Sequence, residues 1–407
     1  MSQVLILPLE STSPGLEGRL GALCALPCDG NLDTENFLIK LNRLPERILP
    51  HPGYLFAQGL NPNLFLKAPC EASFFKDCVE LLNSFDTIIT YSSRPLQTLE
   101  ITALRLCQDL TFPRPNQTII EVSTLLHAIE IFNGIKLNLK NNLINTAKSL
   151  GYKEELSKAK QKEKLLALNF CLNKAKEISP SLFAFLNRPL SYRFNLLTKA
   201  LNEKNGLVCV DRLGKLTLII PLKITGLYVE CIVFGENIVY RDEFNFTQGY
   251  LIAPLSVLTK ERQDAIEIDP TRAMEMLHFW MEKLEQLDDY RVCRPSQKFF
   301  SKLNDQDLEY FKLLIKEECG KHPKAPLGLS LFFKRHLLML LGDNFRKDLS
   351  EEELLNYIDL CNKNAETKLN NYSKAINDLV PLVQDGNDED LKLIEALTYY
   401  PSNLSAQ

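Results

Sequence analysis

The sequence predicts an α/β domain, then a small antiparallel β domain and then a helical domain, and three observations support this order. Residues 4–11, VLILPLES, form an apolar run that ends at turn residues, which is typical of a buried strand opening an α/β sheet. Residues 206–244 are rich in β-branched side chains, alternate in polarity and are interrupted by glycines, which predicts a small antiparallel barrel. Residues 296–407 show helical spacing throughout. A chain of 407 residues is long enough for two or three domains.

The remaining elements of the first domain follow from the spacing of apolar and turn residues. Because strands and helices alternate along this part, we expect an α/β layer fold. The Pro- and Gly-rich stretch 44–62 cannot be regular throughout, and Gly151 is expected to end one of the helices. Strands are predicted at 20–28, 35–43 and 86–93, helices at 73–85, 96–110, 139–151 and 155–178, and a continuation of the strand–helix pattern at 117–132.

Composition excludes several classes of protein. The chain is 45% hydrophobic and 24% charged with a formal net charge of -4, so its total charge does not favour nucleic acid or a membrane surface. No apolar run approaches the roughly 18 residues of a membrane-spanning helix, and the start of the sequence lacks the pattern of a secretory signal. The eleven cysteines are scattered and contain no CxxC, which indicates reduced thiols. We therefore expect a cytoplasmic monomer.

Charge is uneven along the chain. Residues 151–215 contain thirteen Lys and Arg against six Asp and Glu, with aromatic residues between them. This mixture suits a groove for single-stranded nucleic acid, in which cations contact phosphates and rings stack on bases. A solvated helix face beside core aromatics is the alternative interpretation. Residues 351–407 carry four Lys against eleven Asp and Glu, which indicates an acidic helical surface.

Several short segments occur in the order found in one enzyme family. They are LPHPG at 49–53 with GLNP at 59–62, TIITYSS at 87–93, TLIIPL at 217–222, LYVECIV at 227–233 and FFS at 299–301. In this order they resemble bacterial exodeoxyribonuclease I, a 3′→5′ single-strand DNA exonuclease of the DEDD class. The resemblance implies a ribonuclease-H-like exonuclease domain at 1–188, an SH3-like barrel at 189–295 and a helical C-terminal domain at 296–407.

The resemblance also shows where catalytic residues would stand. Enzymes of this class hold two Mg²⁺ ions with four carboxylates, while a His or Tyr activates the attacking water. In this sequence Pro8 and Glu10 occupy the two acidic positions of the Asp-x-Glu motif, and Gln97 occupies the position of the second Asp. Lys158 stands where the family has its base, and Glu163 stands where it has its last acid. Two of the four metal ligands and the base are therefore replaced.

These replacements predict a protein that does not cleave DNA. Proline has no side-chain oxygen, glutamine is neutral and lysine repels a cation, whereas Mg²⁺ requires oxygen ligands. Glu10 and Glu163 together would hold Mg²⁺ weakly, so we expect no cofactor unless the protein is active, in which case it would use Mg²⁺. Lysine and arginine side chains would instead bind single-stranded DNA or its 3′ end, although drift of an unused site would produce the same substitutions. The expected DNA-binding residues are Lys158, Lys160, Lys162, Lys164, Arg188 and Arg193.

Two other functions stay open at this point. An active nuclease would need a rebuilt metal site, for which Glu17, Asp86 and Glu100 are the available acids. A protein-interaction scaffold would have lost DNA binding as well. The resemblance further implies single-stranded DNA-binding protein as a partner. In its docking pocket Thr259 replaces an arginine, and Lys260 or Arg262 would have to substitute for it.

Overall fold

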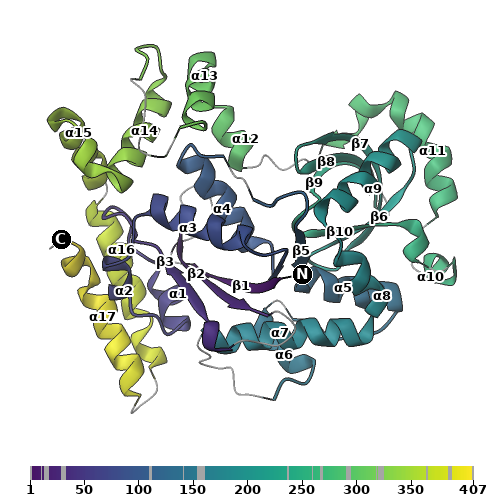
Figure 1. The fold of residues 1–407 in the computed structure, drawn as a ribbon, viewed down its shortest axis with the longest axis horizontal. Helices are drawn as coiled ribbons and strands as arrows, with labels where there is room; N and C mark the ends of the chain where they lie inside the picture. The colour runs from purple at the N-terminus through teal and green to yellow at the C-terminus, as the bar shows by residue number, and fades with distance from the viewer. Residues whose placement is uncertain are drawn as a thin grey trace.

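The computed structural model shows two β-sheets surrounded by helices (Figure 1). A five-stranded sheet and its helices form the first part, a six-stranded sheet the second and a set of helices the third. The structure describes residues 2–10, 12, 18–28, 34–109, 112–140, 142–153, 161–235, 238–258, 260–265, 269–289, 295–317, 319, 325–363, 365–383 and 387–405.

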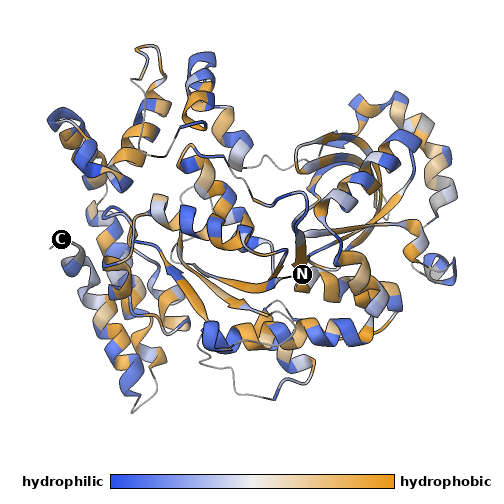
Figure 2. Cartoon of the chain, in the orientation of Figure 1, coloured by the Kyte–Doolittle hydropathy of each residue, from blue (hydrophilic) through white to orange (hydrophobic). Residues whose placement is uncertain are grey.

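The predicted opening strand lies in the middle of the first sheet. Strand β1 (Gln3–Glu10) pairs antiparallel with β2 and parallel with β4 in the order β3-β2-β1-β4-β5. Val4 and Ile6 enter one buried cluster while Leu5 and Leu7 enter another, because successive side chains of a strand point to opposite faces. Figure 2 shows these strands as strongly apolar. The other strands are β2 (Leu20–Pro27), β3 (Leu38–Leu41), β4 (Thr87–Thr90) and β5 (Thr118–Glu121).

Helices cover both faces of this sheet. Helices α3 and α4 pack against Val4 and Ile6, and helices α5 and α7 pack against Leu5 and Leu7. The loop predicted at 44–62 contains one short helix, α1, because a proline is well tolerated in the first helical turn. The helices of this part are α1 (Pro52–Ala57), α2 (Asn63–Leu66), α3 (Glu71–Asn83), α4 (Arg94–Arg105), α5 (Val122–Asn133), α6 (Leu143–Ser149), α7 (Gln161–Ile178) and α8 (Pro180–Leu186).

The second sheet differs from the predicted barrel. Its order is β10-β6-β7-β8-β9-β11, so β10 and β11 are edges and no pairing within the described residues closes the sheet. Helix α9 covers one face through Leu197, and α11 covers the other through Leu277. The elements are α9 (Leu190–Glu203), β6 (Leu207–Asp211), β7 (Leu216–Thr225), β8 (Tyr228–Phe234), β9 (Val239–Asn245), β10 (Tyr250–Pro254), α10 (Lys260–Ala265), α11 (Pro270–Glu282) and β11 (Asp288–Asp289).

The predicted helical part is confirmed, and its contacts with the first part include the end of α4, at Leu104, and α1. Helices α12 to α14 surround Phe299 and Phe333, whereas α16 and α17 pack against Leu55 of α1. No helix in the described portion of the chain has the length and apolar character needed to cross a bilayer. The helices are α12 (Pro295–Phe300), α13 (Asp305–Leu314), α14 (Leu331–Asn344), α15 (Glu351–Asn362), α16 (Ala365–Asn377) and α17 (Asp388–Ser405).

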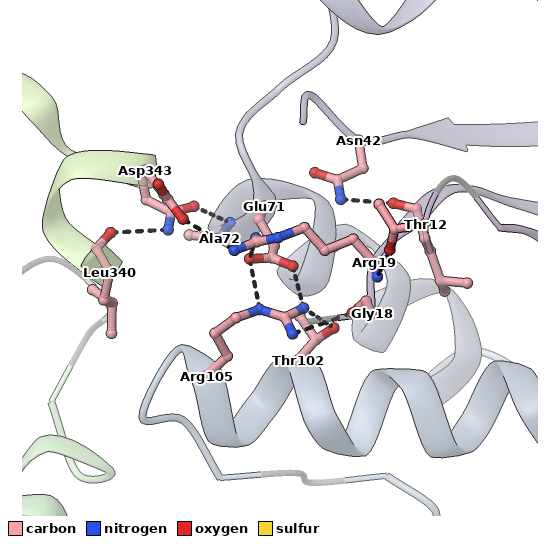
Figure 3. Close-up of polar contacts among 12 residues, drawn as sticks. Thr12, Gly18, Arg19, Asn42, Glu71, Ala72, Thr102, Arg105, Leu340 and Asp343 are labelled. Atoms are coloured by element: carbon pink, nitrogen blue, oxygen red, sulfur yellow. Dashed lines mark hydrogen bonds and ion pairs between the residues drawn. The ribbon is translucent and has the colours of Figure 1, made fainter. Parts of the chain in front are cut away.

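A buried ion-pair network joins the first and third parts (Figure 3). Glu71, the first residue of α3, accepts hydrogen bonds from Arg19 and Arg105. Arg19 also reaches Asp343 of α14 at 3.0 Å, and Arg47 pairs with the same carboxylate at 2.9 Å. Burial on its own would raise the pKa of Glu71, but the charges of Arg105 and Arg19 outweigh burial and lower that pKa to about 2.

We predict that Glu71→Gln lowers the free energy of unfolding by about 3 kcal/mol, because a buried guanidinium loses its ionic partner. Since the pKa of Glu71 is depressed in the folded state, its stabilising contribution is present above its unfolded value of 4.5 and is lost as pH falls toward about 2. Urea unfolding at pH 7 and pH 3 measures both effects, and the difference between variant and wild type should shrink at pH 3. Glu80→Gln, an exposed position on the same helix, is the control; equal losses in the two variants would contradict the prediction.

A second prediction concerns the contact between α14 and α15. A Cβ atom at Gly342 would overlap the ring of Tyr357, which is itself buried at 3% exposure. We therefore expect Gly342→Ala to lower the melting temperature by several degrees although alanine favours helices. Glu352→Ala on the exposed surface of α15 should leave the melting temperature nearly unchanged. A G342A variant as stable as wild type would show that the two helices do not approach this closely.

Candidate nucleic-acid-binding site

A cavity of about 410 Å³ opens at the carboxyl end of β1, and we call it the β1 cleft. Leu7 and Pro8 of β1 form part of its wall. The rest comes from the end of α1, from α6 and its N-cap, and from the first turn of α7. Its polar side chains are Gln58, Asn142, Asn145, Lys148, Gln161 and Lys164.

Local structure explains why the α6 side chains face this cleft. Asn142 is the N-cap of α6, and its side chain accepts a hydrogen bond of 2.9 Å from the backbone N–H of Asn145. The helix is held near the end of β4 by Tyr91, whose hydroxyl lies 2.9 Å from the hydroxyl of Thr146. As predicted, the helix stops at Gly151, where φ is +96°. This brings Asn142, Asn145 and the last-turn Lys148 of α6 to the cleft.

Lys164 lies in the wall of the β1 cleft, whereas Glu163 is not among the lining residues. Consecutive residues of an α-helix point about 100° apart, so the two side chains do not face the same cavity. Burial lowers the pKa of Lys164, and the nearby Cys24 and Glu163 partly oppose that shift. A partly desolvated ammonium therefore lines the cleft near Cys24, the residue of β2 that pairs with Leu7.

The cleft side chains that the structure describes do not form a ligand set for Mg²⁺. Pro8 has no donor atom, and the four amide side chains are neutral. The two lysines would repel a cation. Among the described residues, no three His, Cys, Asp or Glu side chains gather in a way that could hold a metal ion. Amide N–H groups and ammonium groups are instead donors to an anion, and phosphate oxygens are acceptors that match them.

Several predicted positions can be placed only in part or not at all. Glu10 ends β1, opposite Leu20 of β2 and next to a bulge, but its side chain lies outside the described residues. Lys158, Lys160 and Glu17 lie outside them too, as do Thr259 and the side chain of Arg262. Lys260 is exposed at the start of α10.

Two of the acids expected to rebuild a metal site, Asp86 and Glu100, are engaged elsewhere. Asp86 precedes β4 and accepts a hydrogen bond of 3.0 Å from the backbone N–H of Ser2. Gln3 pairs with Thr87, so Pro8 lies five residues further along β1, roughly 16 Å away at 3.3 Å per residue. Asp86 therefore lies near the amino end of β1, whereas Pro8 lies near its carboxyl end.

Glu100 and Gln97 lie on α4. Glu100 accepts a hydrogen bond of 3.0 Å from the hydroxyl of Tyr228 in β8 and so connects α4 with the second sheet. Gln97 is exposed in the first turn of the helix. Neither residue lines the β1 cleft.

The expected DNA-binding cations separate into different environments. Lys162 is half-buried near the start of α7, close to Lys164. Arg188 follows α8 in the sequence, and α8 lies at the other end of α7 (Figure 1). Arg193 does not face solvent: its guanidinium donates to the carbonyl of Ile119 at 2.6 Å, and burial lowers its pKa to about 10. The structure thus assigns Arg193 a role in supporting the chain, contrary to the expectation that it contacts DNA.

The predicted mixture of cations and aromatic rings is present along α7 to α9. Cations lie over ring faces, a geometry in which the positive charge is attracted to the π electrons. Tyr192 and Phe194 are 36% and 43% exposed, so rings are accessible on this surface. The three pairs are Lys174 over Phe170 at 5.9 Å, Lys176 over Phe183 at 5.7 Å and Arg188 over Tyr192 at 4.3 Å.

Glu121 was not expected to matter from the sequence. It ends β5 and accepts a hydrogen bond of 2.6 Å from the backbone N–H of Gly249, in the turn between β9 and β10. Burial raises the pKa of Glu121, which is 8% exposed. The sequence feature that could have indicated it is an acid at the end of the otherwise uncharged strand TIIE. This contact orients the second sheet relative to the carboxyl edge of the first.

No family model and no curated protein matches this chain, whereas solved structures do. A product-bound exonuclease I is 16% identical with a TM-score of 0.73, and SSB/Exonuclease I in complex with the inhibitor CFAM is 15% identical with a TM-score of 0.72. The zinc-bound form of an E. coli ExoI–ssDNA complex is 15% identical with a TM-score of 0.70.

Each of these alignments covers 99% of this chain and 99% of the solved chain. The similarity therefore includes both sheets and the C-terminal helices, as the order of short motifs predicted. At 15–16% identity it concerns architecture and leaves the chemistry to be judged from the side chains. Along essentially its whole length, this protein has the exonuclease I fold.

Proposed function

We propose that this protein binds single-stranded DNA without cleaving it and that the β1 cleft receives a phosphate of the strand. The observation that supports this proposal best is the lining of the cleft. At Pro8 the family resemblance implies a metal-binding carboxylate, and the polar side chains that line the cleft with Pro8 are amides and lysines. A solved protein with the same fold is bound to single-stranded DNA.

The replaced residues change the charge balance in a way that suits binding. In a metal-dependent nuclease, cations neutralise the phosphate and also lower the pKa of the attacking water. The ammonium groups of Lys148 and Lys164 supply the first effect without the second. Asn142, Asn145 and Gln161 add hydrogen-bond donors that can reach phosphate oxygens or base edges. Such a cleft retains a strand and leaves the phosphodiester intact.

The surface along α7 to α9 supports a longer contact with the strand. Helix α7 has 18 residues, about 27 Å at 1.5 Å per residue, and its length separates Lys164 from the Arg188–Tyr192 pair. Exposed rings next to cations bind bases and phosphates of a single strand without strong sequence preference. Single-stranded DNA-binding protein is a further candidate partner, because one solved structure of this fold is a complex with it.

The direct test is incubation of a 3′-labelled oligonucleotide with the protein and either Mg²⁺ or Mn²⁺. We expect the label to stay in the full-length strand, while gel-shift measurements at low salt show a complex that weakens as salt increases. Release of mononucleotides that Glu10→Ala abolishes would overturn the proposal in favour of an active nuclease. Absence of any complex at 20 mM salt would overturn it in favour of a protein-interaction scaffold.

A second prediction identifies the cleft as the site of contact. The double variant Lys148→Ala/Lys164→Ala should lower the slope of log K against log salt by about 1.4, because each single-strand phosphate contact contributes about 0.7. Fluorescence anisotropy with a labelled oligonucleotide between 50 and 200 mM salt measures that slope. Lys392→Ala is the matched control, since Lys392 is exposed on α17 and lies outside both the cleft and the surface along α7 to α9. An unchanged slope in the double variant would place the strand elsewhere.

A further inference from the structure

A second cavity, of about 420 Å³, lies between α4 of the first part and α12 and α14 of the third. We call it the α4–α14 cavity. Its residues come from segments as distant in sequence as Arg47 and Asp343, and it shares no residue with the β1 cleft. Its volume falls within the range of about 300–1,000 Å³ that is typical of small-molecule sites.

The carboxylates of this cavity are already neutralised. Glu71 and Asp343 belong to the lining, and both are held by arginines of the buried network (Figure 3). Arg47 contacts Asp343 at 2.9 Å, and Arg105 donates from Nε to Glu71 at 3.1 Å. The acidic groups therefore do not repel an anion, because their charge is compensated within the protein.

The rim adds cations that no carboxylate of the cavity neutralises. Of the charged side chains in the lining, four are cationic and two are anionic. Lys302 and Arg335 are the exposed cations, and neither forms an ion pair with Glu71 or Asp343. The ammonium of Lys302 lies 5.1 Å from the centre of the Phe332 ring.

The walls are aromatic and apolar. Phe332 and His336 come from α14, and His336 is stacked on Phe333 with an interplanar angle of 7°. Leu331, also in the lining, is 64% exposed and adds an apolar side chain to the wall. A ligand that fits these walls and this rim has a flat ring and a negatively charged group.

We propose that the α4–α14 cavity is a second nucleotide-binding site. The base lies against Phe332 and His336, and the phosphate lies between Lys302 and Arg335. The nucleotide comes either from solution or from the bound strand, and both sources present the same ring and phosphate. The proposal depends on the residues of this cavity and goes beyond the binding proposed for the β1 cleft.

The test measures binding of dAMP by calorimetry and of a labelled oligonucleotide by anisotropy, both at 50 mM salt. In the variant Lys302→Ala/Arg335→Ala we expect at least tenfold weaker binding, because two charge-assisted contacts to phosphate are lost. Phe332→Leu, which keeps an apolar side chain but removes the ring, should weaken binding between about five- and a hundredfold through lost stacking. Lys334→Ala is the control, since Lys334 adjoins Arg335 on α14 but is outside the lining.

The two ligands distinguish the sources. If only dAMP binding depends on Lys302 and Arg335, the site takes a free nucleotide; if only oligonucleotide binding does, it takes a nucleotide of the strand. Affinities for both ligands equal to those of K334A would overturn this proposal. Failure of the β1-cleft proposal is a separate result, in which the wild-type protein binds no oligonucleotide at low salt. Circular dichroism of each variant confirms that the fold is retained.

Discussion

One buried carboxylate, Glu71, determines how the first and third parts of the molecule meet. It lies between Arg19 and Arg105, and Arg19 extends the network to Asp343 on α14. Charges removed from water are tolerated only when they are paired and hydrogen-bonded, so these four side chains constrain one another. Because they come from the start of β2, from α3, from α4 and from α14, the network sets the spacing of helices that are far apart in the sequence. The α4–α14 cavity lies directly against it.

The two proposed sites share one chemical principle, which is that fixed cations would attract a phosphate group. Lys148 and Lys164 in the β1 cleft, and Lys302 and Arg335 at the α4–α14 cavity, supply positive charge for a phosphate. An ammonium or guanidinium group attracts that anion as a metal does, but it does not coordinate and activate water. A fold that other proteins use with a bound metal can in this way hold a strand at more than one point.

Predictions from local pattern were accurate where a single physical rule decides the outcome. The VLILPLES run was expected to be a buried strand of an α/β sheet, and β1 is central because both of its faces are apolar. The predicted barrel is not confirmed, because alternating, β-branched strands suit a closed barrel and an open sheet covered on both faces equally well. Arg193 was misplaced for a related reason: a count of charges does not show which side chains point inward to bind carbonyl groups.

The sequence by itself determined what each side chain can do. Pro8 cannot ligate a metal in any fold because it has no donor atom, and short motifs in a constant order indicated the architecture that the full-length structural match confirms. Tertiary structure alone decided which side chains act together. It placed Lys164 in the β1 cleft and Glu163 outside it, and it brought Arg47, Arg105 and Arg335 around one cavity. The physical reason is that helix phase and long-range packing set the direction of a side chain, and neither is encoded in its near neighbours.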